Sequence, residues 1–276
     1  MTKGIRLTAT LVCFAVLAGH ATSHADTPLF GLKTGPLTAQ TGDYVLCPSR
    51  QFYDAAVEKG IDKTTFIYYT ATLVESNDAT STVRSLSGST YSLPNEMIVP
   101  IPKGQTAKIG DVLLTWWQSG SGMQRAIVVG GTPERPVVRY LDIAYENPSG
   151  AGKKEDTLKP DSFFVLDGTM QLGTMVAVQD GGRQRVGRLL AMDDESVLLD
   201  GFAGKLRRYD RSAATVMPLR PNLKAGDRGE AVVFGSLKSV TVKKLDEKIG
   251  RVFATYQFGR SEKERAFAFG EIRGTP

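Results

Sequence analysis

Apolar and polar residues alternate along much of the chain, in short stretches. Over residues 251–258, for example, every second position from Val252 to Phe258 is apolar. A period of two places one face of a strand in a core and the other face in water. No window carries a sustained apolar stripe with the 3.6-residue period of a helix. The pattern therefore predicts an all-β protein in which helices are short or absent.

One phrase recurs along the chain: a glycine, a polar residue and then an apolar strand. Its four copies are spaced by 68, 63 and 53 residues and begin at Gly42, Gly110, Gly173 and Gly226. Each copy is followed by polar turns, two further apolar stretches and a short apolar tag. Recurrence at such spacings is typical of a tandem array of small domains, because solenoid repeats are usually shorter.

The stretches after each glycine predict the remaining strands. Second strands are expected over 53–58, 123–129, 185–192 and 239–245, and third strands over 65–74, 136–145, 196–200 and 251–258. The closing tags are 97–101, 163–166, 216–219 and 271–272. Five short strands in about 60 residues are typical of a small barrel. The long polar insertion 146–161 is expected to be a loop between strands of the second copy.

The Gly-Asp-x-Val phrase, the Gly/Ser turn, the Ala-x-Val-like second strand and the aromatic third strand resemble the Tudor/agenet group of SH3-like barrels, in an exported bacterial form. The resemblance implies four tandem SH3/Tudor-like five-stranded barrels. Copies three and four depart from it, with Thr174 in place of the aspartate and Arg228-Gly229 before the strand. Because each barrel alone has a small core, neighbours are expected to pack rigidly. The expected barrels cover 26–103, 104–170, 171–222 and 223–276.

The aspartate of the phrase is expected to serve the turn. Asp111, like its counterparts, is predicted to accept a hydrogen bond from a backbone N–H two residues further on.

Residues 1–25 have the pattern of a cleaved signal peptide. Lys3 and Arg6 precede an apolar stretch over 7–19, and Ser-His-Ala precedes Asp26. Thirteen apolar residues fall short of the about 20 that span a bilayer, and no second run of that length follows. The sequence therefore predicts a periplasmic or extracellular protein without a transmembrane segment.

The residue inventory of the expected mature chain excludes several chemistries. The leader contains both histidines, His20 and His24, together with Cys13, so Cys47 is the one remaining thiol. Serine–histidine triads, cysteine–histidine pairs, histidine metal sites and internal disulfides are thereby excluded. A carboxylate-based hydrolase is the remaining common enzyme chemistry, but its candidates, Asp193-Asp194-Glu195, fall in a predicted hairpin turn. We expect no catalytic residue, no metal and no cofactor.

Aromatic residues are the first candidate binding group. The resemblance implies binding through aromatics at a barrel rim, and the second copy carries several in its predicted strands. Neighbouring residues on a strand point to opposite faces, so at most one of the two adjacent tryptophans enters the barrel core. The other then faces a neighbouring domain or a binding rim. The candidates are Trp116, Trp117, Tyr140 and Tyr145.

Basic residues are the second candidate group. Residues 26–172 carry 13 lysines and arginines against 16 aspartates and glutamates, whereas residues 173–276 carry 19 against 13. The second half therefore has either a solvated basic wall or a contact with an anionic surface. Nucleic acid is disfavoured by export and by the lack of interleaved aromatics. The candidate binding residues are Arg183, Arg185, Arg207 and Arg208, with Arg188 and Arg211 nearby in sequence.

These features together predict a non-enzymatic exported binding or adaptor protein that recognises a protein or another macromolecule. The alternative is a module that binds a cell-envelope glycan or peptidoglycan.

Overall fold

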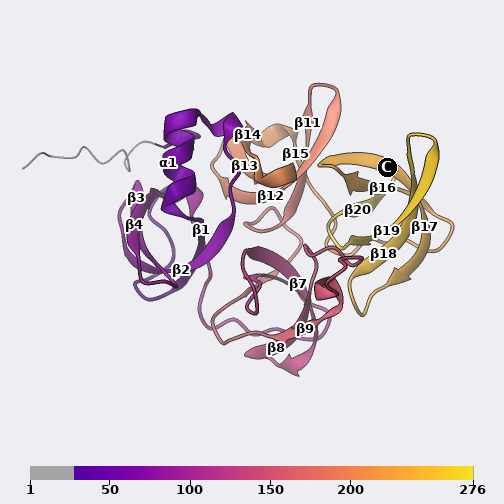
Figure 1. Ribbon diagram of the computed structural model, residues 1–276, viewed down its shortest axis with the longest axis horizontal. Coiled ribbons are helices and arrows are strands. Elements are labelled where there is room, and N and C mark those ends of the chain that lie inside the picture. Colours follow the sequence, from indigo (N-terminus) through magenta and orange to yellow (C-terminus); the bar gives the residue numbers. More distant parts are fainter. Residues whose placement is uncertain (1–27, 276) are drawn as a thin grey trace, which may run out of the picture.

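Three antiparallel sheets form the framework of residues 28–275, the part of the chain that the computed structural model describes. The predicted mostly-β character is confirmed (Figure 1). The described part of the chain has one α-helix, α1 (Arg50–Lys59), and none of its helices is long and apolar enough for a membrane span. The predicted signal peptide over 1–25 lies outside the described residues.

The first sheet has the strand order β4-β3-β2-β1-β5. The strand predicted over 53–58 is wrong: these residues belong to α1, which lies between β1 and β2. Tyr53 and Ala56, three residues apart, are the buried pair on one face of this helix, and such spacing in a short segment fits a helix better than a strand. The predicted third strand is consequently the second strand of this sheet. Its strands are β1 (Tyr44–Pro48), β2 (Tyr68–Ser76), β3 (Thr80–Ser85), β4 (Thr90–Pro94) and β5 (Val99–Pro100).

The second sheet has the order β10-β6-β7-β8-β9. The insertion 146–161, predicted to be a loop, instead contains the strand β9, which pairs with β8. Gly152 also lies against the backbone of Ala144, where an added Cβ would come within 2.2 Å of the carbonyl oxygen. The insertion is therefore packed on the sheet. The strands are β6 (Val112–Trp116), β7 (Met123–Thr132), β8 (Arg135–Tyr140), β9 (Glu155–Thr157) and β10 (Phe164–Leu166).

The third sheet has ten strands in two sets of five. The sets have the orders β15-β11-β12-β13-β14 and β20-β16-β17-β18-β19, and a single pair, Arg185 with Ser236, joins β12 to β17. The first set comprises β11 (Met175–Asp180), β12 (Arg183–Met192), β13 (Ser196–Asp200), β14 (Leu206–Asp210) and β15 (Ala214–Val216). The second comprises β16 (Arg228–Val233), β17 (Ser236–Asp246), β18 (Arg251–Phe258), β19 (Ser261–Ala268) and β20 (Ile272–Gly274).

The recurring glycine begins each set of five strands in the same conformation. Gly110 has φ +89°, its N–H donates to the carbonyl oxygen of Val128 at 2.8 Å, and Val128 donates back to Asp111 at 2.9 Å. The register of the second strand with the third shifts immediately after Val128. Equivalent bonds and shifts follow Gly42, Gly173 and Gly226. Within residues 28–275, no pairing of end strands closes a set into a barrel.

The aspartate beside this glycine caps the turn from the opposite direction to the one predicted. Asp111 Oδ2 accepts a hydrogen bond from the N–H of Lys108, three residues earlier, at 2.9 Å. Asp43 and Asp227 make the same bond at 2.8 and 2.9 Å. The prediction of a donor two residues further on is wrong, because the turn precedes the glycine and leaves its free N–H there.

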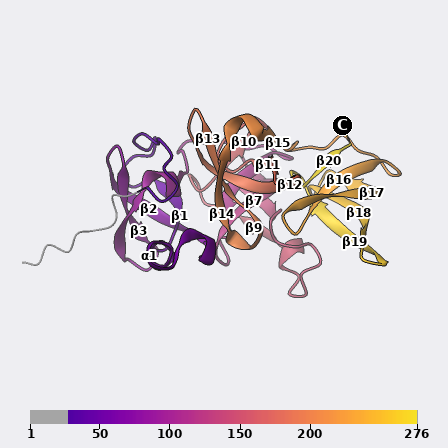
Figure 2. The ribbon, with the colours of Figure 1, turned by 90° about the horizontal axis from the view of Figure 1, so that it is seen from above.

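The four sets pack into one continuous body (Figures 1 and 2). The first sheet and the β16–β20 set lie at opposite ends, with the other two sets between them (Figure 2). One cluster of buried apolar residues runs through all four and includes Val45, Leu114, Leu198 and Phe267. The sets therefore share a core.

A buried ion network also joins the sets. Arg125 of β7 is fully buried and contacts Asp142 at 2.6 Å and the carbonyl oxygen of Phe269 at 2.7 Å. Arg188 of β12 contacts Asp142 at 2.9 Å and Asp200 at 2.7 Å. Burial opposes the charge on Asp142, but Arg125 and Arg188 hold its pKa below the usual value. Burial instead raises the pKa of Asp200, against the attraction of Arg188.

Candidate functional site

A groove of about 460 Å³ lies between the first and second sheets. Its volume falls within the range of ligand sites, about 300–1,000 Å³. The rings of Tyr44 and Trp116 meet across the two sheets with centroids 5.0 Å apart. Four aromatic side chains from four strands line the groove: Tyr44, Tyr69, Tyr91 and Trp116.

The rest of the lining is rich in hydroxyl and amide groups. The Oγ1 of Thr70 is buried without a hydrogen-bond partner in the described chain. A buried polar atom left unpaired costs free energy, so this position favours a ligand that supplies the missing bond. The other hydroxyl and amide side chains in the lining are Ser49, Ser85, Ser87, Ser89, Ser121, Gln51 and Gln118.

The charged side chains of the groove are basic. Arg50 and Lys159 line it, and no carboxylate does. Arg50 is partly neutralised by Asp54, 2.7 Å away. Lys159 forms no ion pair with any residue that the structure describes. The groove therefore offers a positive charge to a ligand at one side of its aromatic surface.

Of the two adjacent tryptophans, Trp116 lines the groove and Trp117 does not. Trp116, 6% exposed, ends β6 and packs in the shared core facing the first sheet. Trp117 packs against the core of the second sheet instead. Its ring covers Gly120, where an added Cβ would lie 2.3 Å away, and its Nε1 donates to Ser119 Oγ at 2.8 Å. Trp117 thus orders the loop 117–122, part of which lines the groove.

Tyr140 and Tyr145 do not line the groove. Tyr140 is buried; its hydroxyl donates to Asp156 at 3.0 Å and accepts from the N–H of Gln118 at 3.0 Å. Burial raises the pKa of Tyr140, so the hydroxyl keeps its proton and holds Gln118 in place. Tyr145 packs edge-on against Phe253 of β18, 5.5 Å away. Of the four predicted aromatics, the groove therefore contains Trp116 alone.

The predicted arginines also lie outside the groove, and they divide among other sites. Arg208 donates to the carbonyl oxygen of Phe30 at 3.0 Å and to Ser196 Oγ at 2.8 Å, so it fastens the N-terminal segment. Arg185 and Arg207 line one small cavity together. Arg183 lines a different one, which it shares with Arg185.

Most of the groove-lining residues were not predicted from the sequence. Tyr44, Tyr69 and Tyr91 come from three strands of the first sheet and meet Trp116 only because the second sheet packs beside them. The available signal was the serine and glycine content of two turns, 85–89 and 119–122. Such turns leave hydroxyl groups at the end of a sheet.

The described residues contain neither a cluster of metal ligands nor an activated thiol. No group of histidine, cysteine, aspartate and glutamate side chains within residues 28–275 has an arrangement suited to a metal ion. Cys47 is buried, and burial raises the pKa of its thiol to about 12. A thiol without thiolate character is a poor nucleophile.

Comparison with known proteins adds no relative to this picture: no protein-family model matches the chain, and no curated protein matches it.

Proposed function

We propose that this protein is a non-enzymatic binding protein that holds an anionic glycan strand of the cell envelope in the groove between its first two sheets. The lining of the groove carries this proposal. Aromatic faces stack on the C–H faces of sugar rings, and hydroxyl and amide groups exchange hydrogen bonds with sugar hydroxyls. Lys159 and Arg50 supply the attraction for an acidic substituent.

The proposed architecture is a tandem array of four SH3/Tudor-like units with limits near residues 103, 170 and 222. The common strand order supports it, as do the positive-φ glycine and the shift of register after it in each set. In this arrangement the groove lies between the first and second units, and packing of the units shapes it.

Export supports a ligand of the cell envelope. The proposed signal peptide over 1–25 carries the protein to the periplasm or the outside of the cell, where envelope glycans are found.

A protein segment is the second candidate ligand. Tyrosine and tryptophan are enriched at protein interfaces, and Leu86, which is 74% exposed, stands in the groove lining as an apolar contact that a sugar does not need. A protein bound here would use the same aromatic rings.

Sedimentation with purified cell-wall sacculi tests the proposal. The wild-type protein should be retained, and Tyr69→Ala should weaken retention by about tenfold or more, because it removes a stacking surface. Tyr256→Ala, which removes a half-buried tyrosine from β18 at the far end of the molecule, is the matched control and should bind like the wild type. Circular dichroism checks that both variants are folded.

Two results would contradict the glycan proposal. A wild-type protein that stays in the supernatant would favour the protein segment. Equal retention of Tyr69→Ala and wild type would place the glycan outside the groove.

A further inference from the structure

Three exposed phenylalanines gather where the two halves of the ten-stranded sheet meet. Phe202, Phe234 and Phe258 are 58%, 59% and 53% exposed. Their ring centroids are 5.7 Å apart for the first pair and 5.8 Å apart for the second. They come from the turn after β13, the turn between β16 and β17, and the end of β18. Contiguous exposed apolar surface marks an interaction site. We name these three residues the phenylalanine patch.

At two of these turns, residues other than glycine have positive φ angles, which such residues rarely adopt. Phe234 and Gly235 form the two-residue turn of the β16–β17 hairpin with φ +50° and +73°. Such turns favour asparagine or glycine at both positions, and a bulky residue there is strained. Ala203, next to Phe202, has φ +58°. Strained residues that persist in a fold cluster at functional sites.

A cavity of about 170 Å³ opens between Phe202 and Phe234. It is too small for a drug-sized ligand, for which about 300 Å³ is the lower limit, but it admits one side chain. Its charged lining consists of Arg185, Lys205 and Arg207, with no carboxylate. This cavity is therefore suited to an apolar group that has a negative charge beside it.

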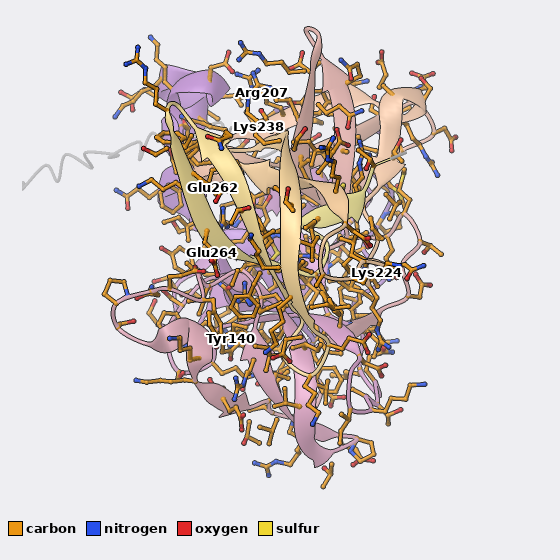
Figure 3. The ribbon with its side chains drawn as sticks, turned by 90° about the vertical axis from the view of Figure 1, so that its right-hand side faces the viewer. Tyr140, Arg207, Lys224, Lys238, Glu262 and Glu264 are labelled. Carbon is orange, nitrogen blue, oxygen red and sulfur yellow. The ribbon has the colours of Figure 1, made fainter. Side chains whose placement is uncertain are left out.

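The arginines that line the cavity are not neutralised by neighbouring carboxylates of the described chain. Arg207 forms no ion pair within residues 28–275, and Arg185 has only a long contact of 3.8 Å with Asp180. Figure 3 shows this side of the molecule, with Arg207 and Lys238 toward its upper end and the carboxylates Glu262 and Glu264 below them.

Carboxylates of the neighbouring cavities are already paired. Glu271 contacts Arg265 at 3.6 Å, and Glu230 contacts Arg273 at 2.7 Å. The charge left for a partner at the 170 Å³ cavity is consequently positive, while Glu262 and Glu264 lie on β19 outside its lining.

We infer that the phenylalanine patch docks an acidic segment of a partner protein, with one apolar side chain in the 170 Å³ cavity and a neighbouring carboxylate facing Arg207 and Arg185. A concave cavity that fits a single side chain favours a polypeptide over a bilayer surface, which presents nothing to fill it. This site is separate from the groove and does not rest on the proposed glycan ligand.

Selection of peptides from a displayed library of random sequences of about twelve residues tests the inference. Peptides selected on the wild-type protein should carry an apolar residue within two positions of aspartate or glutamate. Their affinity should fall about tenfold or more in Phe234→Asn and in Arg207→Glu. Changing the acidic residue of a peptide to lysine should restore part of its affinity for Arg207→Glu.

Phe234→Asn separates binding from folding. Asparagine suits the turn, so this variant should melt at the same or a higher temperature than the wild type while it loses the peptide. Ile109→Asn, which removes an apolar side chain that is 73% exposed on the second sheet's side, is the control and should bind normally.

Four results would overturn the inference. The first is that the selected peptides do not carry an apolar residue near an aspartate or glutamate. The second is that Phe234→Asn binds the selected peptides as tightly as the wild type does. The third is that the wild-type protein sediments with vesicles containing about 30% phosphatidylglycerol and Phe234→Asn does not. This result would assign the patch to lipid binding. The fourth is a dimer that the same variant dissociates, which would assign the patch to a second copy of this chain.

Discussion

The groove and the ion network both lie between sheets, but their polar groups differ. In the ion network, Asp142 and Asp200 each have an arginine within 2.9 Å, so the protein supplies the counter-charges itself. In the groove, the Oγ1 of Thr70 is buried without a partner, and Lys159 has no carboxylate to pair with among the described residues. The carboxylates of the ion network are thus paired within the chain, although Arg188 Nε is buried without a hydrogen-bond partner among the described residues. The groove, by contrast, leaves Lys159 without a counter-charge from those residues.

This difference separates structural from binding roles at the contacts between sheets. A buried charge that loses its partner is expensive, so the ion network should tolerate little change. Apart from Trp116, which is also buried in the shared core, the lining of an open groove should tolerate substitution and respond through ligand affinity.

Removing Arg125 should have one of the two largest effects on stability. Arg125→Met leaves Asp142 with one arginine and removes the hydrogen bond to Phe269, so the free energy of unfolding should fall by about 3–5 kcal/mol. Urea unfolding measures it. The control is Arg139→Met, which breaks the partly exposed pair with Glu155 and should cost less than about 1 kcal/mol. Equal losses in the two variants would show that the network is not a structural junction.

The two tryptophans should differ in a predictable order. Trp116→Ala empties a buried site in the shared core and should cost about 3–5 kcal/mol in urea unfolding. Trp117→Ala removes a half-buried ring and should cost less, while it loosens the loop 117–122 and weakens ligand binding. Two equally severe losses would mean that both rings are core residues and that the loop has no separate role.

The ion network should also make the free energy of unfolding depend on pH in the acid range. The pKa of Asp142 is lowered in the folded protein, so its ion pairs stabilise the fold above the unfolded pKa and are lost as the pH falls through the folded value. Asp200 acts oppositely: its pKa is raised, so protonation relieves a cost as the pH falls. Asp142→Asn should therefore flatten the decline in unfolding free energy between about pH 5 and 3.

The matched variant Asp200→Asn should steepen that decline, because it removes the compensating group. The same slope in the wild type and both variants would contradict the assigned pKa directions.

The smallest effect is expected at the turn that begins the second set of strands. Asp111→Ala removes the hydrogen bond to Lys108 and should cost about 0.5–1.5 kcal/mol in urea unfolding. Asp227→Ala, which removes the equivalent bond to Lys224, should cost the same. Ligand binding by the folded proteins should not change. A loss of binding in Asp111→Ala would show that the turn contributes to the groove.

Local periodicity predicted the strands well where one face is buried. The strand expected over 251–258 has the same bounds as β18, and Val252 and Ala254 are buried as predicted. The alternation is incomplete, because Arg251 and Thr255 on the other face are also buried and Phe258 is 53% exposed. The helix α1 was missed because ten residues with a few apolar side chains are ambiguous without their packing partners. Tertiary contacts of Tyr53 and Ala56 decide the conformation there.

The sites were harder to predict because they depend on packing between distant segments. Trp116 was identified from the strand pattern, but its partners Tyr44, Tyr69 and Tyr91 belong to another sheet. Adjacent residues can also have different roles: Arg207 lines a cavity, whereas Arg208 donates a hydrogen bond to the carbonyl oxygen of Phe30. A pleated strand sends neighbours to opposite faces, but the sequence does not say which face is covered.

A fluorescence titration with a single tryptophan tests the groove most directly. The chain contains two tryptophans, so Trp117→Phe leaves Trp116 as the sole reporter, in the groove lining. Addition of soluble glycan strands released from sacculi should change its emission in a saturable way, with the same affinity that calorimetry reports. Binding detected by calorimetry with no change in Trp116 emission would contradict the account, because the glycan would then occupy another surface.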